Sequence, residues 1–446
     1  MRILLLTHAF NSLTQRFYVE LVEKGHDVSI EFDINDSVSI EAVEMFRPDL
    51  VVAPYLRRAI PETIWKNHLC IVIHPGIVGD RGPSALDWAI LNDETRWGVT
   101  ALQANEVMDG GNIWATAEFA MRPAKKSSLY RNEVTEAAVE CLHDVLEKMA
   151  DDTFSPRRLD YTDESVCGQL RPLMQQRDRC IDWLQDTTQT ILRKIRSADG
   201  FPGVLDQLAD REYFLYDAHA EDQLRGEPGE IIARRDQAIC RATVDGAVWI
   251  GHLKAKPPEG ERGFKLPATL ALGEPLVDIP DVPLAVWEGA ERNTYQEISY
   301  REEGEVGYLR FEFYNGAMST EQCERLLAAY HYAKQQPTRV LVLLGGNDFW
   351  SNGIHLNVIE NAVSPADESW RNINAIDDVA RAIIETDDKI TIAALRGNAG
   401  AGGVFMALAA DRVYARRGVV LNPHYKSMGN LYGSEYWTYL LPKRVG

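Results

Sequence analysis

Short apolar runs alternate with helix-like segments from the start of the chain to His74. The first run, RILLL, is followed by a segment at 12–24 that carries apolar residues at helical spacing and ends at Gly25. Three further runs have the composition of strands: HDVSIEF, PDLVVAPYL and HLCIVIH. Because strands that alternate with helices usually pair in parallel, the pattern predicts a parallel α/β sheet. The first strand lacks a following Gly-x-Gly-x-x-Gly, which disfavours dinucleotide binding.

The fourth run ends on a histidine and opens into a loop rich in glycine and proline. Residues 71–91 read IVIHPGIVGDRGPSALDWAIL, so His74 closes the strand and Gly79, Gly82 and Pro83 follow it. In open parallel sheets, ligands bind beyond the carboxyl ends of the strands. A strand-end histidine followed by backbone-permissive residues therefore marks a candidate catalytic position. The alternative interpretation is that His74 only caps a strand.

Composition limits the class of protein. A chain of 446 residues corresponds to roughly two to four domains. The formal net charge of −19 disfavours nonspecific binding to nucleic acid or to anionic membranes. The six cysteines form no Cys-x-x-Cys pair, so neither a disulfide framework nor a metal site is expected. No run reaches the ~20 apolar residues of a membrane span, and we expect a cytoplasmic protein.

The rest of the chain predicts further domains. A helix is expected at about 129–149, and the polar, turn-rich segment 151–169 is typical of a linker. A helix over 180–198 followed by short strands indicates a small, OB-like β-barrel, and a Pro- and Gly-rich connector follows. A second strand–helix alternation starts near 296. The predicted parts are 1–158, 165–262, a connector at 263–295, and 296–446.

Residues 71–114 resemble the folate-dependent formyltransferases, which include methionyl-tRNA formyltransferase. That family has Asn-x-His-Pro-Ser-Leu-Leu-Pro, an Arg-Gly-Pro turn, Trp-Ala-Ile, Gly-Val-Thr and Asp-x-Gly-Asp-Ile. The chain has IHPGIVG, RGP, WAI, GVT and DGGNI in the same order. By this resemblance, His74 is the catalytic histidine and Asp109 the catalytic aspartate. CIDW and IRSADGFPGV are similar to the family's C-terminal barrel domain, so the resemblance covers 1–158 as a Rossmann-like domain and the predicted barrel as well.

The resemblance also implies where 10-formyltetrahydrofolate binds. RAIP falls where the family wraps the pterin ring, and the Arg-Gly-Pro turn follows the histidine loop. The predicted cofactor-binding residues of this part are Arg58, Ile60, Arg81 and Gly82. Formyl transfer passes through a tetrahedral oxyanion, which a strand-end histidine can stabilise or supply with a proton. A nearby aspartate can orient the imidazole.

One position departs from the formyltransferase motif. The asparagine two residues before the histidine is Val72 here. The missing carboxamide puts the usual amine acceptor in doubt. A thiol acceptor depends less on such a carboxamide, because a thiolate is already a strong nucleophile.

Residues 296–446 resemble the crotonase (enoyl-CoA hydratase/isomerase) superfamily. NDFWSNGIHL is similar to its Phe-x-Ala-Gly-x-Asp-Leu loop, and RGNAGAGGVFMALAADRVYA to its Gly-rich helix start. In that family two backbone N–H groups bind the thioester oxygen of an acyl-CoA, and the matching positions are Ile354 and Gly402. Gly353 and Gly403 are the predicted coenzyme A-binding neighbours, since glycine lets the backbone approach the ligand closely. The alternative is a Gly-rich turn packed against a strand.

The crotonase-like part also departs from its family. The two catalytic glutamates of the hydratases fall at Phe405 and His424, and His355 replaces the aspartate of the first loop. We therefore expect an acyl-CoA oxyanion hole without hydratase chemistry. Tyr425 and Glu435 lie where the family borders the acyl group and are the predicted catalytic side chains. The alternative is that Tyr425 belongs to the core and Glu435 starts a helix, while the two histidines are structural.

A formyltransferase joined to a crotonase-like domain resembles the HypX/HoxX family of hydrogenase maturation factors over the whole chain. That family is understood to make carbon monoxide for NiFe-hydrogenase. The resemblance implies formyl transfer from 10-formyltetrahydrofolate to coenzyme A, followed by decarbonylation of formyl-CoA. Transient contact with hydrogenase assembly proteins is expected. Two alternatives remain for the transfer between the sites: one coenzyme A serves both, or formyl-CoA dissociates and rebinds.

Two other functions fit parts of the pattern. One is a formyltransferase that acts on an amine, with a third domain that only binds coenzyme A. The other is a non-catalytic scaffold that binds folate and coenzyme A. The sequence ends at LLPKRVG, where crotonases continue with further helices, so the crotonase-like domain is expected to be incomplete.

Overall fold

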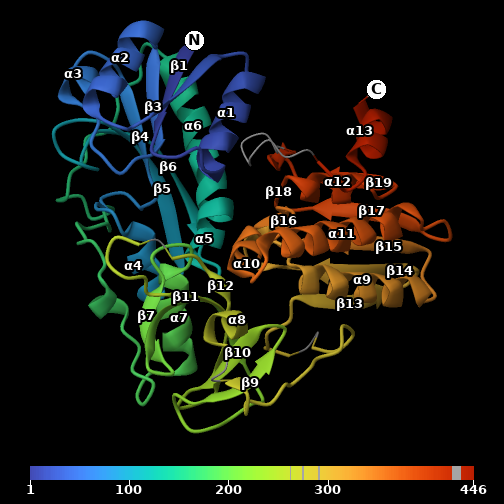
Figure 1. Cartoon of the computed structure of the whole chain (residues 1–446). Coiled ribbons are helices and arrows are strands. Elements are labelled where there is room, and N and C mark those ends of the chain that lie inside the picture. The colour runs from blue at the N-terminus through green and yellow to red at the C-terminus, as the bar shows by residue number, and fades with distance from the viewer. Residues whose placement is uncertain (262, 274–275, 290–291, 424–432, 446) are drawn as a thin grey trace. The chain divides into compact units, whose positions relative to one another are not determined.

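The computed structural model describes residues 1–261, 263–273, 276–289, 292–423 and 433–445 (Figure 1). The chain forms two compact units. Unit 1 comprises Met1–Arg179 and Arg196–Phe201, and unit 2 comprises Cys180–Ile195 and Pro202–Gly446. Each unit carries one of the two motifs that the sequence indicates.

Unit 1 contains a six-stranded sheet of order β2-β1-β3-β4-β5-β6. Its strands are β1 (Arg2–Thr7), β2 (Asp27–Phe32), β3 (Leu50–Tyr55), β4 (Cys70–His74), β5 (Arg96–Gln103) and β6 (Ile113–Ala120). The first four strands pair in parallel, as predicted. β5 and β6 extend the sheet in antiparallel register, which the alternation at the start of the chain does not predict.

Both faces of this sheet are covered, which explains why its strands are apolar almost throughout. On one face, Ile3 and Leu5 join a core with α1 (Ser12–Glu23) and α6 (Thr135–Met149). On the other face, Leu4 and Leu6 join a core with α2 (Asp36–Phe46) and α3 (Glu62–Trp65). The other helices are α4 (Ala85–Leu91), α5 (Lys126–Leu129), the π-helical turn η1 (Tyr130–Val134) and the 3₁₀ turn η2 (Gln176–Arg179). The predicted helix at 129–149 therefore comprises the last residue of α5, the turn η1 and the helix α6.

The polar segment expected to be a linker is part of unit 1. It forms backbone hydrogen bonds to the loop after β4: Gly168 N–H donates to the Val78 carbonyl at 3.0 Å, and Arg81 N–H to the Gln169 carbonyl at 3.2 Å. The Tyr161 hydroxyl donates to the Gly79 carbonyl at 3.0 Å. The segment therefore covers the loop that follows His74.

The middle part of the chain is an antiparallel sheet of order β7-β8-β11-β10-β9, with β12 paired to β11. The strands are β7 (Val204–Leu208), β8 (Arg211–Glu221), β9 (Ile231–Arg235), β10 (Ala238–Ala242), β11 (Ala247–Ala255) and β12 (Leu266–Pro267). Helix α7 (Thr188–Ala198) starts later than predicted. The reason is local: Asp182 accepts from Leu184 N–H at 3.0 Å, and Asp186 from Asp182 N–H at 2.8 Å, so these carboxylates favour turns over a helix.

The predicted connector packs on this sheet. It contains the short helix α8 (Ala268–Leu272). Arg235 donates to the Val282 carbonyl at 2.6 Å and to the Tyr295 carbonyl at 2.9 Å. Thr294 donates to the Glu221 carboxylate, which also accepts from the Trp249 indole at 2.7 Å. Buried charge-assisted hydrogen bonds of this kind hold an otherwise irregular segment in place.

The last part of unit 2 contains two sheets. The larger has the order β13-β14-β15-β17-β19, and the smaller β16-β18-β20. The strands are β13 (Ile298–Glu303), β14 (Val306–Phe311), β15 (Val340–Leu344), β16 (Phe349–Ser351), β17 (Ile390–Leu395), β18 (Asn398–Gly400), β19 (Arg412–Ala415) and β20 (Leu421–Asn422). The helical elements are η4 (Tyr314–Gly316), α9 (Thr320–Gln335), α10 (Leu356–Asn361), α11 (Pro365–Ile384), α12 (Gly402–Leu408) and α13 (Trp437–Val445).

Parallel pairing in the smaller sheet brings the two glycine-containing motifs together. Phe349 pairs with Asn398, and Ser351 with Ala399. β16 leads into the loop with Gly353 and Ile354, while β18 leads into the start of α12. Two segments that are distant in sequence therefore end side by side (Figure 1).

No helix in the described part of the chain is long and apolar enough to cross a membrane. The described residues also contain no cluster of His, Cys, Asp or Glu side chains that could hold a metal ion.

Replacing Gly168 with alanine should destabilise unit 1, because the added methyl would lie 1.9 Å from the Asp80 backbone nitrogen. Backbone cannot give way as a flexible side chain can, so we expect a loss of about 1–3 kcal/mol in the free energy of unfolding. Denaturant unfolding measures it. The exposed Glu164→Ala variant, in the same segment, is the matched control. Equal stability of the two variants would contradict the close packing.

Candidate functional sites

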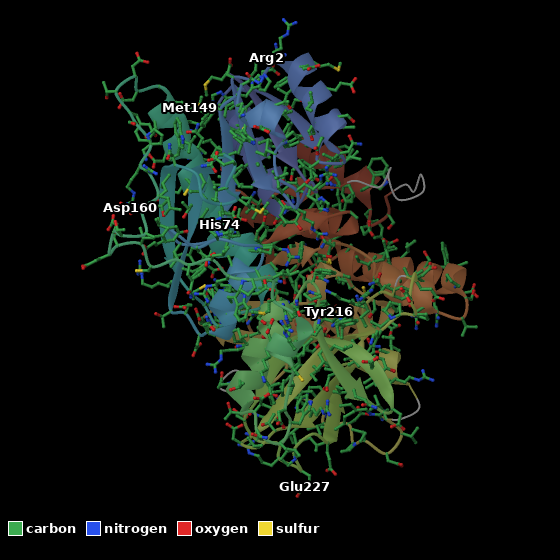
Figure 2. All side chains as sticks on the ribbon, turned by 90° about the vertical axis from the view of Figure 1, so that its left-hand side faces the viewer. Arg2, His74, Met149, Asp160, Tyr216 and Glu227 are labelled. Atoms are coloured by element: carbon green, nitrogen blue, oxygen red, sulfur yellow. The ribbon has the colours of Figure 1, made fainter. Side chains whose placement is uncertain are left out.

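The first candidate site is centred on His74, the last residue of β4. Its side chain is buried, with 5% exposed. Nε2 lies 3.0 Å from Asp80 Oδ1, and Nδ1 lies 3.7 Å from Asp109 Oδ2. The imidazole therefore lies between two carboxylates of unit 1. Figure 2 labels His74 on the ribbon of this unit. The first distance is that of a hydrogen bond and the second is longer than one.

Side chains of β5 fix the start of the loop after His74. The Trp97 indole donates to the Pro75 carbonyl at 2.9 Å, and the Thr100 hydroxyl to the Gly76 carbonyl at 2.8 Å. Gly76 stands where the formyltransferase motif has serine. A methyl group there would lie 2.4 Å from His74 Nε2 and 2.8 Å from Asp80 Oδ1. The space that a side chain would need is taken by the histidine and its carboxylate partner.

The Arg-Gly-Pro turn holds the loop that carries Asp109. Arg81 Nε donates to the Met108 carbonyl at 3.0 Å, and Gly82 N–H donates to Asp109 Oδ2 at 3.2 Å. Asp109 has φ +54°, a left-handed conformation that costs energy for most residues and that aspartate tolerates better than most. These contacts aim the Asp109 carboxylate at His74. The folate-binding role of Arg81 and Gly82 stays a prediction.

Two residues near His74 are not singled out by the sequence pattern. Asp80 is 1% exposed, and its Oδ2 lies 3.4 Å from Arg171 Nε. An acidic residue next to an Arg-Gly turn is ordinarily a solvated loop residue, and Arg171 follows a segment that has the composition of a linker. In the sequence, the position of Asp80 next to the Arg-Gly-Pro turn is the one feature that links it to the site.

The other two predicted folate-binding residues lie near the end of β3. Arg58 Nη2 pairs with Asp36 Oδ1 at 2.6 Å on the surface, where both side chains are about half exposed or more. Ile60 is 6% exposed and belongs to the core cluster that also contains Val43 and Ile64. Contact of either residue with a pterin ring stays a prediction.

The second candidate site lies in unit 2, where the two glycine-containing loops meet. Gly353 has φ +78°, and a methyl group on it would lie 3.2 Å from the Gly402 backbone nitrogen. Its carbonyl accepts from Met318 N–H at 2.9 Å. Within the described part of the chain, neither Ile354 N–H nor Gly402 N–H donates to a protein acceptor. Unpaired backbone donors of this kind are what an oxyanion hole requires.

Close backbone packing accounts for the third glycine of this group. A methyl group on Gly403 would lie 2.2 Å from the Ser351 carbonyl oxygen. The Gly403 carbonyl itself accepts from the Trp350 indole at 3.0 Å. Gly403 therefore joins α12 to β16, and a direct contact with coenzyme A stays a prediction.

Glu435 borders this site. It is 3% exposed, and a methyl group on Gly402 would lie 2.1 Å from its Oε1, so the carboxylate lies directly against the predicted oxyanion hole. Its backbone has φ +48°, and its N–H donates to Asp377 Oδ1 at 2.7 Å. Burial raises the pKa of Asp377. A strained, anchored and buried acid is a typical feature of functional sites.

The other residues that the sequence singles out here are Tyr425, His424, Phe405 and His355. Tyr425 and His424 lie outside the described residues. Phe405 is 2% exposed within α12, and its ring centroid lies 6.3 Å from that of Trp437. An apolar ring therefore occupies one of the positions at which hydratases carry a glutamate.

His355 has a structural role next to the predicted oxyanion hole. Its Nδ1 accepts from Val358 N–H at 3.3 Å and so caps α10, while its own N–H donates to Asn372 Oδ1 at 3.1 Å. Burial, followed by the nearby His252, lowers the pKa of His355 from 6.5 to about 3. The neutral ring keeps a lone pair for the cap. Its ring centroid lies 6.3 Å from that of His252 in β11.

Acid should weaken unit 2 through His355. Between pH 6.5 and about 3, the unfolded chain binds a proton there that the folded chain does not, so stability falls as the pH drops through this window. His355→Asn keeps a capping oxygen but does not titrate. We expect its free energy of unfolding to fall less than that of the unmodified protein between about pH 7 and about pH 5. Denaturant titrations at both values measure this, with the exposed His331→Asn as control; equal slopes for both variants would contradict it.

Three family models match the chain. Formyl transferase matches residues 26–146, the formyl transferase C-terminal domain matches 173–262, and enoyl-CoA hydratase/isomerase matches 304–446. The first two include the His74 site and the middle sheet. The third includes the paired glycine loops.

Individual proteins match over longer stretches. The chain is 54% identical over 446 residues to a hydrogenase maturation factor HoxX of Bradyrhizobium diazoefficiens, covering all of this chain and 76% of that protein. It is 22% identical over 267 residues to a methionyl-tRNA formyltransferase of Geobacter sulfurreducens, covering 57% of this chain and 82% of that protein. The crystal structure of HypX from Aquifex aeolicus in complex with tetrahydrofolic acid superposes with a TM-score of 0.96 at 52% identity, covering 100% of this chain and 78% of that one.

Proposed function

The chain belongs to the family of hydrogenase maturation factors known as HoxX or HypX, and from this premise we propose that it makes carbon monoxide in two steps. Unit 1 transfers the formyl group of 10-formyltetrahydrofolate to the thiol of coenzyme A. Unit 2 then splits formyl-CoA into carbon monoxide and coenzyme A. The observation that carries the proposal is the buried Glu435 carboxylate against Gly402, next to two backbone donors that have no acceptor among the described residues.

The first step needs an acceptor that attacks the formyl carbon. The thiol sulfur forms a bond to that carbon while its proton passes to a base, and a tetrahedral oxyanion results. The bond from the carbon to N10 of folate then breaks, and N10 takes up the proton. His74, with Asp109 beside it, supplies the base and the stabilisation. Val72, on the same strand, brings no carboxamide to grip an amine.

The second step needs one base, a polarised carbonyl and a proton for the sulfur. In formyl-CoA, the Ile354 and Gly402 N–H groups hydrogen-bond the thioester oxygen. The Glu435 carboxylate removes the formyl proton, the carbon–sulfur bond breaks, and carbon monoxide leaves. The thiolate receives a proton, for which Tyr425 is our proposed donor, and the proton that Glu435 removed then returns to Tyr425. No oxidant or reductant is consumed, and the atoms of formyl-CoA are fully divided between carbon monoxide and coenzyme A.

Supplying both substrates tests the proposal directly. The protein is incubated with 10-formyltetrahydrofolate and coenzyme A, released gas is trapped with reduced haemoglobin, and the coenzyme A pool is analysed by mass. Carbon monoxide that appears only when both substrates are present supports the two steps. Formyl-CoA without carbon monoxide would contradict the second step, and turnover with an amine alone would favour an amine transferase. No turnover at all would favour a scaffold.

Glu435→Gln should stop release of carbon monoxide and leave formation of formyl-CoA intact. The amide keeps the shape of the side chain but cannot take a proton, so we expect a loss of at least about 100-fold in the rate of carbon monoxide release. Mass analysis of the coenzyme A pool should show formyl-CoA accumulating. The exposed Glu360→Gln is the matched control. An unchanged rate of release would exclude Glu435 as the base.

A further inference from the structure

A second carboxylate holds the histidine of the first site. Asp80 Oδ1 lies 3.0 Å from His74 Nε2, closer than Asp109 lies to Nδ1, and both members of this pair are buried. Asp109 is accounted for by the formyltransferase motif, whereas Asp80 has no place in the motif as the sequence presents it. A buried charged group without a function is costly, so this contact requires an explanation.

The hydrogen bond fixes which ring nitrogen carries the proton. An ionised carboxylate can only accept, so Nε2 must donate to Asp80, and the neutral imidazole keeps its lone pair on Nδ1. Arg171 Nε lies 3.4 Å from Asp80 Oδ2, so the carboxylate also forms an ion pair through its other oxygen. Nδ1 faces the second acid across 3.7 Å, a separation that leaves its lone pair available to a proton from elsewhere.

The surrounding backbone is built tightly around this pair. Asp80 N–H donates to the Ile77 carbonyl at 2.9 Å, which closes the turn that carries the carboxylate. Gly168 packs against the same backbone nitrogen so closely that a methyl group would lie 1.9 Å from it. The backbone of Asp80, from which the carboxylate reaches His74, is therefore held in place from two sides. Such a preorganised orienting group is what a general base requires.

We propose that Asp80 is a positioning residue for formyl transfer: it keeps the His74 proton on Nε2 and so presents Nδ1 as the base that accepts the acceptor's thiol proton. This inference rests on the proposed function of unit 1. The proton passes from sulfur to Nδ1 as the carbon–sulfur bond forms. The same proton then passes from Nδ1 to N10 of folate as the carbon–nitrogen bond breaks, so His74 ends as it began.

Orientation of His74 by Asp80 explains how a thiol acceptor can be deprotonated without the asparagine of the motif. A thiol has a removable proton near neutral pH, so a neutral imidazole with a fixed tautomer is a suitable base. Asp109 then faces the imidazolium that forms and stabilises its charge on the Nδ1 side. The two carboxylates therefore have different roles: Asp80 fixes the tautomer of His74, and Asp109 stabilises the positive charge of the imidazolium.

Asp80→Asn tests the inference because it keeps the size of the side chain and allows its amide to donate to Nε2. We expect His74 to move its proton to Nδ1, and kcat for formyl-CoA formation to fall roughly 10³-fold or more, as when the orienting aspartate of a serine protease is replaced. KM for 10-formyltetrahydrofolate should change less than about threefold. Nitrogen-15 NMR of labelled histidine in the full chain, recorded without substrates, reports the tautomer.

A structural role would give a different result. Arg171→Gln removes the ion pair on the other oxygen of Asp80 but leaves its bond to His74, so the Nε2-protonated signal and most of kcat should persist. Equal losses in Asp80→Asn and Arg171→Gln, with an unchanged tautomer in both, would overturn the inference. If the unmodified protein makes no formyl-CoA, the proposed function fails instead, and the tautomer measurement still decides whether Asp80 orients His74.

Discussion

Backbone segments that approach too closely for a side chain between them hold both candidate sites together. In unit 1, Gly168 lies against the backbone of Asp80, and the turn that presents this acid to His74 is fixed from both sides. In unit 2, Gly353 lies against the Gly402 nitrogen, and Gly403 against Ser351. Because a methyl group would overlap backbone atoms at Gly168 and Gly403 and would be tightly crowded at Gly353, these contacts place N–H groups and carboxylates with a precision that flexible side chains alone do not reach.

Much of the framework could be predicted from the sequence, because its signals are local. The apolar runs predict β1 to β4, and the histidine of the motif lies at the carboxyl end of β4. The sequence does not predict that parallel pairing ends at β4. The antiparallel addition of β5 depends on contacts that no short pattern encodes. Helix α7 starts later than the sequence pattern predicts because Asp182 and Asp186 form local hydrogen bonds that compete with the helix.

The candidate sites are predictable only where the resemblance to a family indicates the residue. His74, Asp109, Ile354 and Gly402 came from motifs, and the structure brings each pair of loops together. Asp80 and Arg171 could not be found in this way, because one is a common loop residue and the other follows a segment with the composition of a linker. Their importance depends on three-dimensional packing of residues 161–171 on the loop after β4, which is a tertiary property.

Two of the departures from the family motifs, at Val72 and Phe405, concern the same chemical property of a formyl thioester. Hydration of an enoyl group needs a base for the water that adds to one carbon of the double bond and an acid that protonates the other carbon, whereas a formyl group has no such bond and offers only its own proton. With Phe405 packed as an apolar ring, the described part of the site keeps one buried acid, Glu435, beside its backbone donors. On the proposed pathway, the substrate is a one-carbon group carried on sulfur. An asparagine that binds an amine is then not needed at Val72, and a hydratase glutamate is not needed at Phe405.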